Sequence, residues 1–209
     1  MADLVYRATK GSRLTSAEGD SNISELNRRT GQGWSDMPSP VTILTGASAP
    51  TTTAIIGGIV GMQFSADVNQ ECFSNAHLNH DYIVGSMVYP HIHFTTKGTT
   101  SGTVRFGVEW TLARRSDSTG LVVFGATQTL YIEKAITGSD TLKHMICEPA
   151  DGFGIDGTNL ETDSLILFRY FRDAEHVNDT YTEPVIMLVV DVHYQCDKIS
   201  TPLRTPPFI

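Results

Sequence analysis

The sequence has little positive charge outside its N-terminal segment. Of its 209 residues, 15 are Lys or Arg and 23 are Asp or Glu, and five of the basic residues lie within residues 1–30. The rest of the chain carries 10 basic and 19 acidic residues. Affinity for DNA or RNA depends on basic side chains that neutralise phosphates. This charge balance therefore predicts that nucleic acid is not a partner.

Cysteine is also scarce. Cys72, Cys147 and Cys196 are widely spaced, and no two of them form a C-x-x-C pair. A disulfide framework or a cysteine-rich zinc cluster needs more cysteines at closer spacing. We therefore expect three reduced, buried thiols in a protein made in a cytosol.

Long apolar runs are missing as well. Residues 37–66 carry no charged side chain, but Pro38, Pro40, Pro50 and two adjacent glycines interrupt this segment. A membrane-spanning helix needs about 20 predominantly apolar residues, and residues 1–7 do not have the basic stretch and apolar core of a signal peptide. We expect no membrane partner. We interpret residues 37–66 as loops and strands on a surface that another protein covers.

Sequence signatures of catalysis are absent. The chain contains no G-x-S-x-G, no G-x-x-x-x-G-K-[ST] and no H-E-x-x-H. The glycine-rich stretch 152–157 resembles a phosphate-binding loop only in composition, because no lysine and no helical pattern follow it. We therefore predict that the protein is not an enzyme and uses no cofactor.

The residues that are present favour strands and turns. Charged residues make up 18% of the chain, below the roughly 25% of an average soluble domain, whereas 18 glycines and nine prolines supply many turns. Apolar runs, several of them with period-two alternation, mark eight candidate strands at 59–66, 72–78, 87–96, 103–114, 121–132, 142–147, 164–172 and 185–195. About eight strands of this length predict an all-β protein, a β-sandwich or jelly roll.

One short helix is expected before the strands. Thr15 and Glu18 have the spacing of a capping box, which predicts a helix over 16–29. Its apolar face is thin, so we expect it to dock on something else. The chain is thus divided into an N-terminal attachment arm (1–40), a β domain (41–198) and an extended C-terminal arm (199–209).

Histidines on two candidate strands form the pattern that is most typical of a functional site. His91 and His93 are two residues apart and lie on one face of their strand, and Asp191 and His193 do the same on another. If these strands pair, three imidazoles and a carboxylate converge as ligands that suit zinc or iron. The pattern equally fits polar-face histidines that hydrogen-bond to neighbouring strands, or H-x-H strands that share a metal on a trimer axis. The sequence alone therefore assigns no firm metal site.

Two segments of the chain resemble proteins of tailed bacteriophages. Residues 10–22 resemble the Lys-Gly-Ser-Pro-Leu-Thr segment near the start of accessory virion proteins, although Arg13 replaces the proline and Ile23 replaces an aromatic residue. Residues 81–94 resemble the Pro-His-x-His-aromatic strand of phage structural proteins, and residues 192–197 resemble their final strand.

This resemblance implies a structural component of a virion that is assembled in the bacterial host cytoplasm. It implies an attachment arm whose partner-binding residues are Lys10, Gly11, Leu14, Thr15, Glu18, Asp20 and Asn22. Because the chain has no shaft-like repeat, we expect a homotrimeric capsid cement or decoration protein. Its partners would be the major capsid protein or tail and portal proteins. The alternative is a tail fibre or fibre-base protein. A more distant alternative is a metal- or carbohydrate-binding module, or a hydrolase, built on the histidine face.

Overall fold

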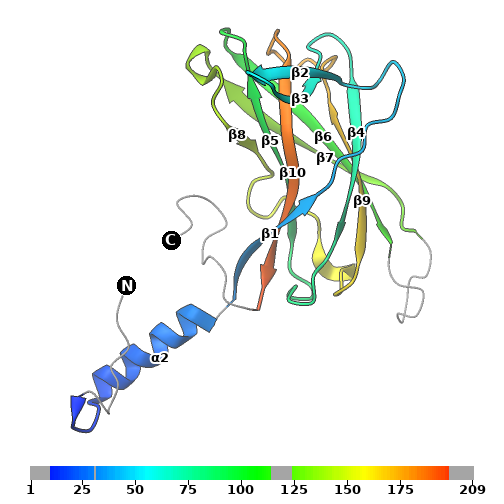
Figure 1. Ribbon diagram of the computed structural model, residues 1–209. Coiled ribbons are helices and arrows are strands. Elements are labelled where there is room, and N and C mark those ends of the chain that lie inside the picture. Colours follow the sequence, from blue (N-terminus) through cyan, green and yellow to red (C-terminus); the bar gives the residue numbers. More distant parts are fainter. Residues whose placement is uncertain (1–9, 31, 114–123, 198–209) are drawn as a thin grey trace.

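Two antiparallel sheets pack face to face and form the body of the molecule (Figure 1). The computed structural model describes residues 10–30, 32–113 and 124–197. The first sheet contains β1 (Gly33–Ser39), β2 (Thr51–Ile56), β3 (Ile59–Phe64), β5 (Val88–Thr96), β8 (Met145–Cys147) and β10 (Val185–Cys196). The second contains β4 (Gln70–His77), β6 (Gly102–Ala113), β7 (Gln128–Ile136) and β9 (Leu165–Arg172). The predicted all-β sandwich is therefore confirmed.

Strand β10 is the centre of the first sheet. One of its edges pairs with β5 from Val185 to Tyr194. The other edge pairs with β3 at Val185–Met187 and then with β1 from Val190 to Cys196. Strand β10 thus pairs with β1, β3 and β5, and β8 extends the sheet beyond β5.

The core lies between the two sheets and follows from the period-two alternation of the strands. Ile92 and Phe94 of β5 and Val190 of β10 are fully buried and belong to one continuous apolar cluster. Phe94 meets Phe106 of the opposite sheet edge to face, with ring centroids 5.5 Å apart. Residues between these positions on β5 and β10 therefore point to the other face of the first sheet.

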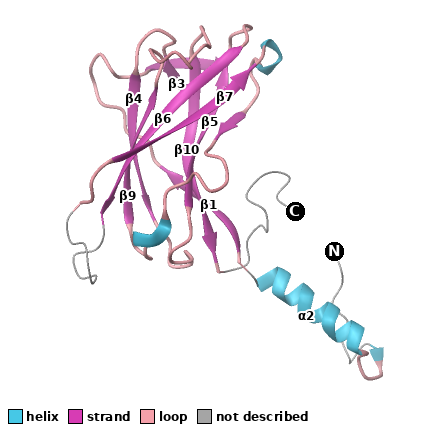
Figure 2. Cartoon of the chain, turned by 180° about the vertical axis from the view of Figure 1, so that it is seen from behind, coloured by secondary structure: helices cyan, strands magenta, loops and turns pink. Residues whose placement is uncertain are grey.

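Helix α2 (Ser16–Thr30) extends away from one end of the sandwich (Figures 1 and 2). Its first turn has the predicted capping box. The Thr15 amide donates to Glu18 Oε2 at 2.8 Å, and the Glu18 amide donates to Thr15 Oγ1 at 3.2 Å. Lys10 also pairs with Glu18, and together these hydrogen bonds lower the pKa of Glu18 to about 2. Three of the expected arm residues, Lys10, Thr15 and Glu18, thus cap the N-terminus of this helix.

The sequence predicts an extended, proline-interrupted connector over 34–50, but this segment is partly strand. Residues Gly33–Ser39 form β1, so they belong to the sandwich and not to the arm as predicted. Pro38 obscured this strand in the sequence. Among the described residues β1 pairs only with β10, and at its other edge a residue without an N–H is tolerated. A second unexpected strand, β2, pairs with β3 as a hairpin.

Strand β7 begins later than the sequence suggests. The apolar run over 121–132 predicts a strand, but β7 starts at Gln128, and Phe124 lies outside it and is exposed. Residues 121–123 lie outside the described part of the chain, as does the expected C-terminal arm over 199–209.

The uncharged segment over 37–66 is covered in part by the chain itself. Met37 and Phe64 lie in the core, whereas Ile56, Ile59 and Val60 on the β2–β3 hairpin remain exposed. No helix within the described residues is both long and apolar enough to cross a membrane.

A buried ion pair ties β9 to the loop that follows it. Arg172 and Asp179 are almost fully buried, and the guanidinium donates from Nε and Nη2 to the two carboxylate oxygens at 2.9 and 2.7 Å. It also donates to the carbonyl oxygens of Tyr181 and Glu183. Four of its five N–H groups thus donate to described oxygen atoms, which stabilises the buried charge.

We expect Arg172→Met to lower the free energy of unfolding by about 3–5 kcal/mol, because Asp179 would remain buried without its partner. Urea denaturation followed by fluorescence measures this change. The exposed Lys97→Met is the matched control and should stay within about 0.5 kcal/mol of the parent protein. A loss below 1 kcal/mol for Arg172→Met would contradict the structural role of the pair.

Candidate metal centre

Three neighbouring strands place polar side chains on the outer face of the first sheet. In the register of the sheet, Asp36 of β1 lies opposite His193 of β10, and Asp191 of β10 lies opposite His91 of β5. His93 follows two residues after His91 and therefore points to the same face. The sequence pattern predicted that the β5 and β10 groups would converge if these strands paired, and the strands do pair.

Asp191 is the meeting point of two imidazoles. His91 Nε2 forms an ion pair with Asp191 Oδ1, and His93 Nε2 lies 3.2 Å from the same oxygen. One ligand atom from each of the three residues lies within 4.8 Å of the others. We call His91, His93 and Asp191 the Asp191 cluster.

The Asp191 carboxylate keeps its negative charge in this buried position. Burial by itself would raise the pKa of Asp191, but the hydrogen bonds and positive charge of His91 and His93 outweigh it and lower the pKa to about 2. The cluster therefore presents an ionised oxygen ligand beside two nitrogen ligands.

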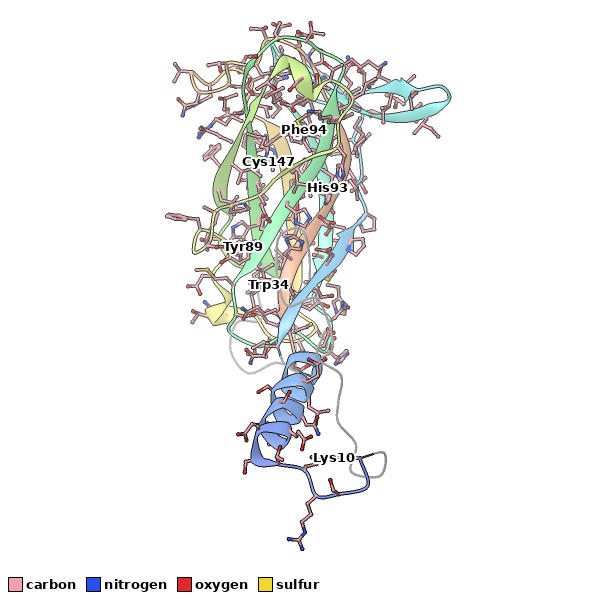
Figure 3. All side chains as sticks on the ribbon, turned by 90° about the vertical axis from the view of Figure 1, so that its left-hand side faces the viewer. Lys10, Trp34, Tyr89, His93, Phe94 and Cys147 are labelled. Atoms are coloured by element: carbon pink, nitrogen blue, oxygen red, sulfur yellow. The ribbon has the colours of Figure 1, made fainter. Side chains whose placement is uncertain are left out.

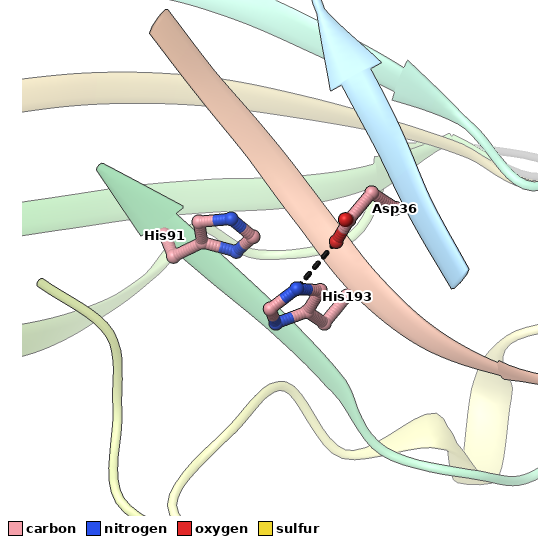
Figure 4. Close-up of side chains that lie close together, drawn as sticks. All are labelled: Asp36, His91 and His193. Atoms are coloured by element: carbon pink, nitrogen blue, oxygen red, sulfur yellow. Dashed lines mark ion pairs between the residues drawn. The ribbon is translucent and has the colours of Figure 1, made fainter. Parts of the chain in front are cut away.

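A second group of three lies beside the first and shares His91 with it. Asp36 pairs with His193 Nε2, and a ligand atom of His91 lies within 4.8 Å of both (Figure 4). The rings of His91 and His193 have centroids 4.0 Å apart. We call Asp36, His91 and His193 the His193 cluster.

His193 has a carboxylate on each side of its ring. Nε2 faces Asp36, and Nδ1 lies 3.3 Å from Glu148 Oε2. Burial by itself would lower the pKa of His193, but hydrogen bonds to Asp36 and Glu148 outweigh it and raise the pKa to about 9. In the metal-free protein this ring is therefore positively charged at neutral pH.

A fourth imidazole contacts the Asp191 cluster from the segment before β8. His144 Nε2 lies 2.6 Å from His93 Nδ1, and the two rings stack with centroids 4.9 Å apart. Burial and the nearby charge of His93 lower the pKa of His144. A neutral His144 can thus accept a hydrogen bond from His93 Nδ1 and direct Nε2 of His93 at Asp191.

Both clusters border a cavity of about 590 Å³. His144, one of its lining residues, is exposed, so solvent reaches the cavity. The described lining residues include no Ser, Thr, Tyr, Trp or Phe. Cys147 also lines the cavity, but burial raises the pKa of its thiol to about 12. The described wall therefore contains no hydroxyl nucleophile, and its one thiol is protonated at neutral pH.

One ring nitrogen in the centre has no hydrogen-bond partner among the described residues. His91 is 1% exposed, and its Nδ1 is buried and unpaired, whereas its Nε2 faces Asp191. Leaving a buried polar atom unsatisfied costs about 1–3 kcal/mol. A cation that binds this nitrogen would remove that penalty.

The structure brings together all four candidate ligands from the sequence, namely His91, His93, Asp191 and His193. It adds Asp36, His144 and Glu148, which the sequence pattern did not identify. Asp36 was missed because β1 was interpreted as a connector. His144 and Glu148 were missed because they flank the three-residue strand β8, whose pairing with β5 has no signal in the sequence.

The expected arm residues and two other histidines lie away from this centre. His77 and His80 contact Asp163, at 3.6 and 3.1 Å. The seven expected arm residues lie at and near the start of α2, and Figure 3 shows Lys10 at the far end of the molecule from His93.

No known protein family and no curated protein matches this sequence. Several solved structures are similar to it, and three of them share 13% identity with this chain. TmCBM61 in complex with β-1,4-galactotriose has a TM-score of 0.29 and covers 82% of this chain and 91% of its own. The C-terminal family 22 carbohydrate-binding module of Clostridium thermocellum Xyn10B has a TM-score of 0.33, with coverages of 81% and 88%. The N-terminal CBM22-1–GH10 modules of the same xylanase, complexed with xylohexaose, have a TM-score of 0.28 and coverages of 77% and 26%.

These comparisons contradict the expected function as a capsid cement or decoration protein. They also give no support to the alternative function as a tail fibre protein. The similar structures are carbohydrate-binding modules and not virion components. Because the identities and TM-scores are low, no ligand is transferred to this chain, and its function is argued from the centre alone.

We expect the charge on His193 to make the free energy of unfolding of the metal-free protein depend on pH. Its pKa is raised from 6.5 to about 9 on folding. Its contribution to the free energy of unfolding is therefore fully present below pH 6.5 and is lost as pH rises through about 9. Chemical denaturation in EDTA at pH 6.5 and 9.5 measures this loss. It should shrink in Asp36→Asn but persist in the exposed control Asp67→Asn. An equal loss in both variants would contradict the assignment to His193.

Proposed function

We propose that this protein is a β-sandwich module that binds a divalent transition-metal ion at the Asp191 cluster without catalysing a reaction. The observation that carries the proposal is the convergence of His91 Nε2 and His93 Nε2 on one oxygen of the buried Asp191, beside a cavity that both histidines line. Two imidazoles and one carboxylate form a ligand set typical of zinc and related metals.

The charges and hydrogen bonds of the Asp191 cluster favour the binding of a cation. Asp191 is ionised, and His144 contacts the Nδ1 side of His93 and orients its Nε2. Metal-ligating histidines are commonly oriented by a hydrogen bond on their other ring nitrogen. The Asp191 cluster thus has its ligands, their charge and one orienting partner in place before any ion arrives.

The carboxylates around the cavity favour binding over catalysis. Hydrogen bonds from Asn178 and Arg105 lower the pKa of Glu133, and hydrogen bonds from Thr137 lower the pKa of Asp140. A general base works best when its pKa is near the working pH. These two carboxylates are therefore poor proton acceptors, and Glu148 is engaged with His193.

A carbohydrate is the less favoured ligand for this cavity. The similar modules carry galactotriose or xylohexaose in their structures, but among the described residues this wall has no Trp, Tyr or Phe. Small organic ligands generally bind against apolar and aromatic side chains with a few polar groups. The charged wall here suits an ion better.

We expect EDTA-stripped protein to bind Zn²⁺ when titrated in a calorimeter. His93→Ala and Asp191→Asn should each weaken this binding by more than about 100-fold, because loss of a ligand exceeds the 10–100-fold effect of losing an orienting partner. His80→Ala, which removes an exposed histidine outside the cavity, is the matched control and should bind like the parent protein. Near-ultraviolet circular dichroism confirms that each variant is folded. Unchanged binding in His93→Ala and Asp191→Asn would refute the proposed site.

We also expect Zn²⁺ to stabilise the folded protein, because an ion that binds only the native state shifts the unfolding equilibrium. At a free concentration 100 times Kd the gain is about 2.7 kcal/mol. Differential scanning calorimetry should show a higher Tm with Zn²⁺ that EDTA reverses. Mg²⁺, which prefers oxygen ligands, is the control ion and should leave Tm unchanged. Equal stabilisation by Mg²⁺ would contradict a nitrogen-rich site.

A further inference from the structure

The cavity wall carries more metal-ligating groups than one ion uses. A protein-bound zinc ion takes four ligands in most sites. Seven such side chains contact one another here: Asp36, His91, His93, His144, Glu148, Asp191 and His193. The Asp191 cluster accounts for three of them, and His144 orients one of those. The surplus is concentrated in the His193 cluster.

The His193 cluster has its own ligands. Asp36 comes from β1 and His193 from β10, and neither belongs to the Asp191 cluster. Only His91 is common to both groups. Removing the ligands of one cluster therefore leaves two ligands of the other in place.

The two clusters are built on the same plan. His193 directs Nε2 at the Asp36 carboxylate while Glu148 faces its Nδ1. His93 directs Nε2 at the Asp191 carboxylate while His144 faces its Nδ1. In each case one ring nitrogen is held by a partner, as is common for metal-ligating histidines, and the other contacts a carboxylate oxygen.

His91 lies between these two histidines. Its ring centroid is 4.0 Å from that of His193 and 4.8 Å from that of His93. Its Nε2 faces Asp191, and its buried Nδ1 has no hydrogen-bond partner among the described residues. An imidazole can bind a metal through either ring nitrogen. Once its N–H proton is released to solvent, the imidazolate ring of His91 can bind one ion on each side.

We propose that the His193 cluster holds a second divalent transition-metal ion, so that the centre is dinuclear and His91 is a ligand shared by the two ions. This inference rests on the proposed function of the Asp191 cluster. It adds a second site whose own ligands are Asp36 and His193. The Glu148 carboxylate then acts as the orienting partner of His193.

The stoichiometry of Zn²⁺ tests this directly. The EDTA-stripped full chain is loaded with Zn²⁺, desalted and analysed for metal, and we expect two ions per chain. Asp36→Asn and His193→Gln should each reduce the count to one, and His93→Ala should also leave one. Asp140→Asn, which removes a cavity carboxylate outside both clusters, is the matched control and should keep two. Near-ultraviolet circular dichroism verifies the fold, and the count for the parent protein is informative even if a variant does not fold.

The outcomes separate this inference from the proposed function. No bound ion in the parent protein would refute both. One ion per chain, lost in His93→Ala and retained in Asp36→Asn, would overturn the second site and keep the first. Two ions whose number is unchanged in Asp36→Asn and His193→Gln would place the second ion elsewhere and also overturn the inference.

Electron paramagnetic resonance of the Cu²⁺-loaded protein tests the sharing of His91. With two ions joined through one imidazole, spin coupling should reduce the signal below the sum of two isolated ions. Asp36→Asn should then show the full signal of a single ion. Two bound ions with an undiminished signal would overturn the shared ligand.

Discussion

The register of β10 between β1 and β5 is the constraint on which the centre depends. Antiparallel pairing sets His91 opposite Asp191 and Asp36 opposite His193. The same pairing directs Val190 and Val192 into the core. A slip of one residue would turn the apolar side chains outward and the polar ones inward, so core burial and assembly of the centre are enforced together. The hydrophobic effect that forms the sandwich thereby also fixes where the imidazoles and carboxylates meet.

The molecule handles buried charge in two different ways. Around Arg172, the strong donors of the guanidinium meet Asp179 and two backbone carbonyls, which is the arrangement of a structural ion pair. Around His91, one ring nitrogen meets Asp191 and the other meets no described group. Satisfied polar groups stabilise a fold, whereas an unsatisfied one in a cavity wall is typical of a site that receives a ligand. This contrast separates the candidate metal centre from the other ion pairs of the sandwich.

The short motifs located important segments but did not identify the function. The segment over 10–22 contains a helix cap, in which Lys10, Thr15 and Glu18 interact with one another. The Pro-His-x-His segment is β5, which supplies two ligands of the centre. Their resemblance to virion proteins implied a capsid role that the structural comparisons contradict. Local patterns of this kind report the geometry of a strand or a cap, and the chemistry depends on what the fold places opposite them.

The sequence by itself determined the all-β class, the capped helix at 16–29 and the shared face of His91 with His93 and of Asp191 with His193. These features follow from local rules, namely composition, cap spacing and the period of two in a strand. Only the tertiary structure decided that β5 and β10 are neighbours, that residues 33–39 form a strand carrying Asp36, and that the flanks of β8 supply His144 and Glu148. The reason is physical: pairing between distant strands is set by packing of the whole core, and β1, which contains Pro38, has too little apolar periodicity to be predicted as a strand.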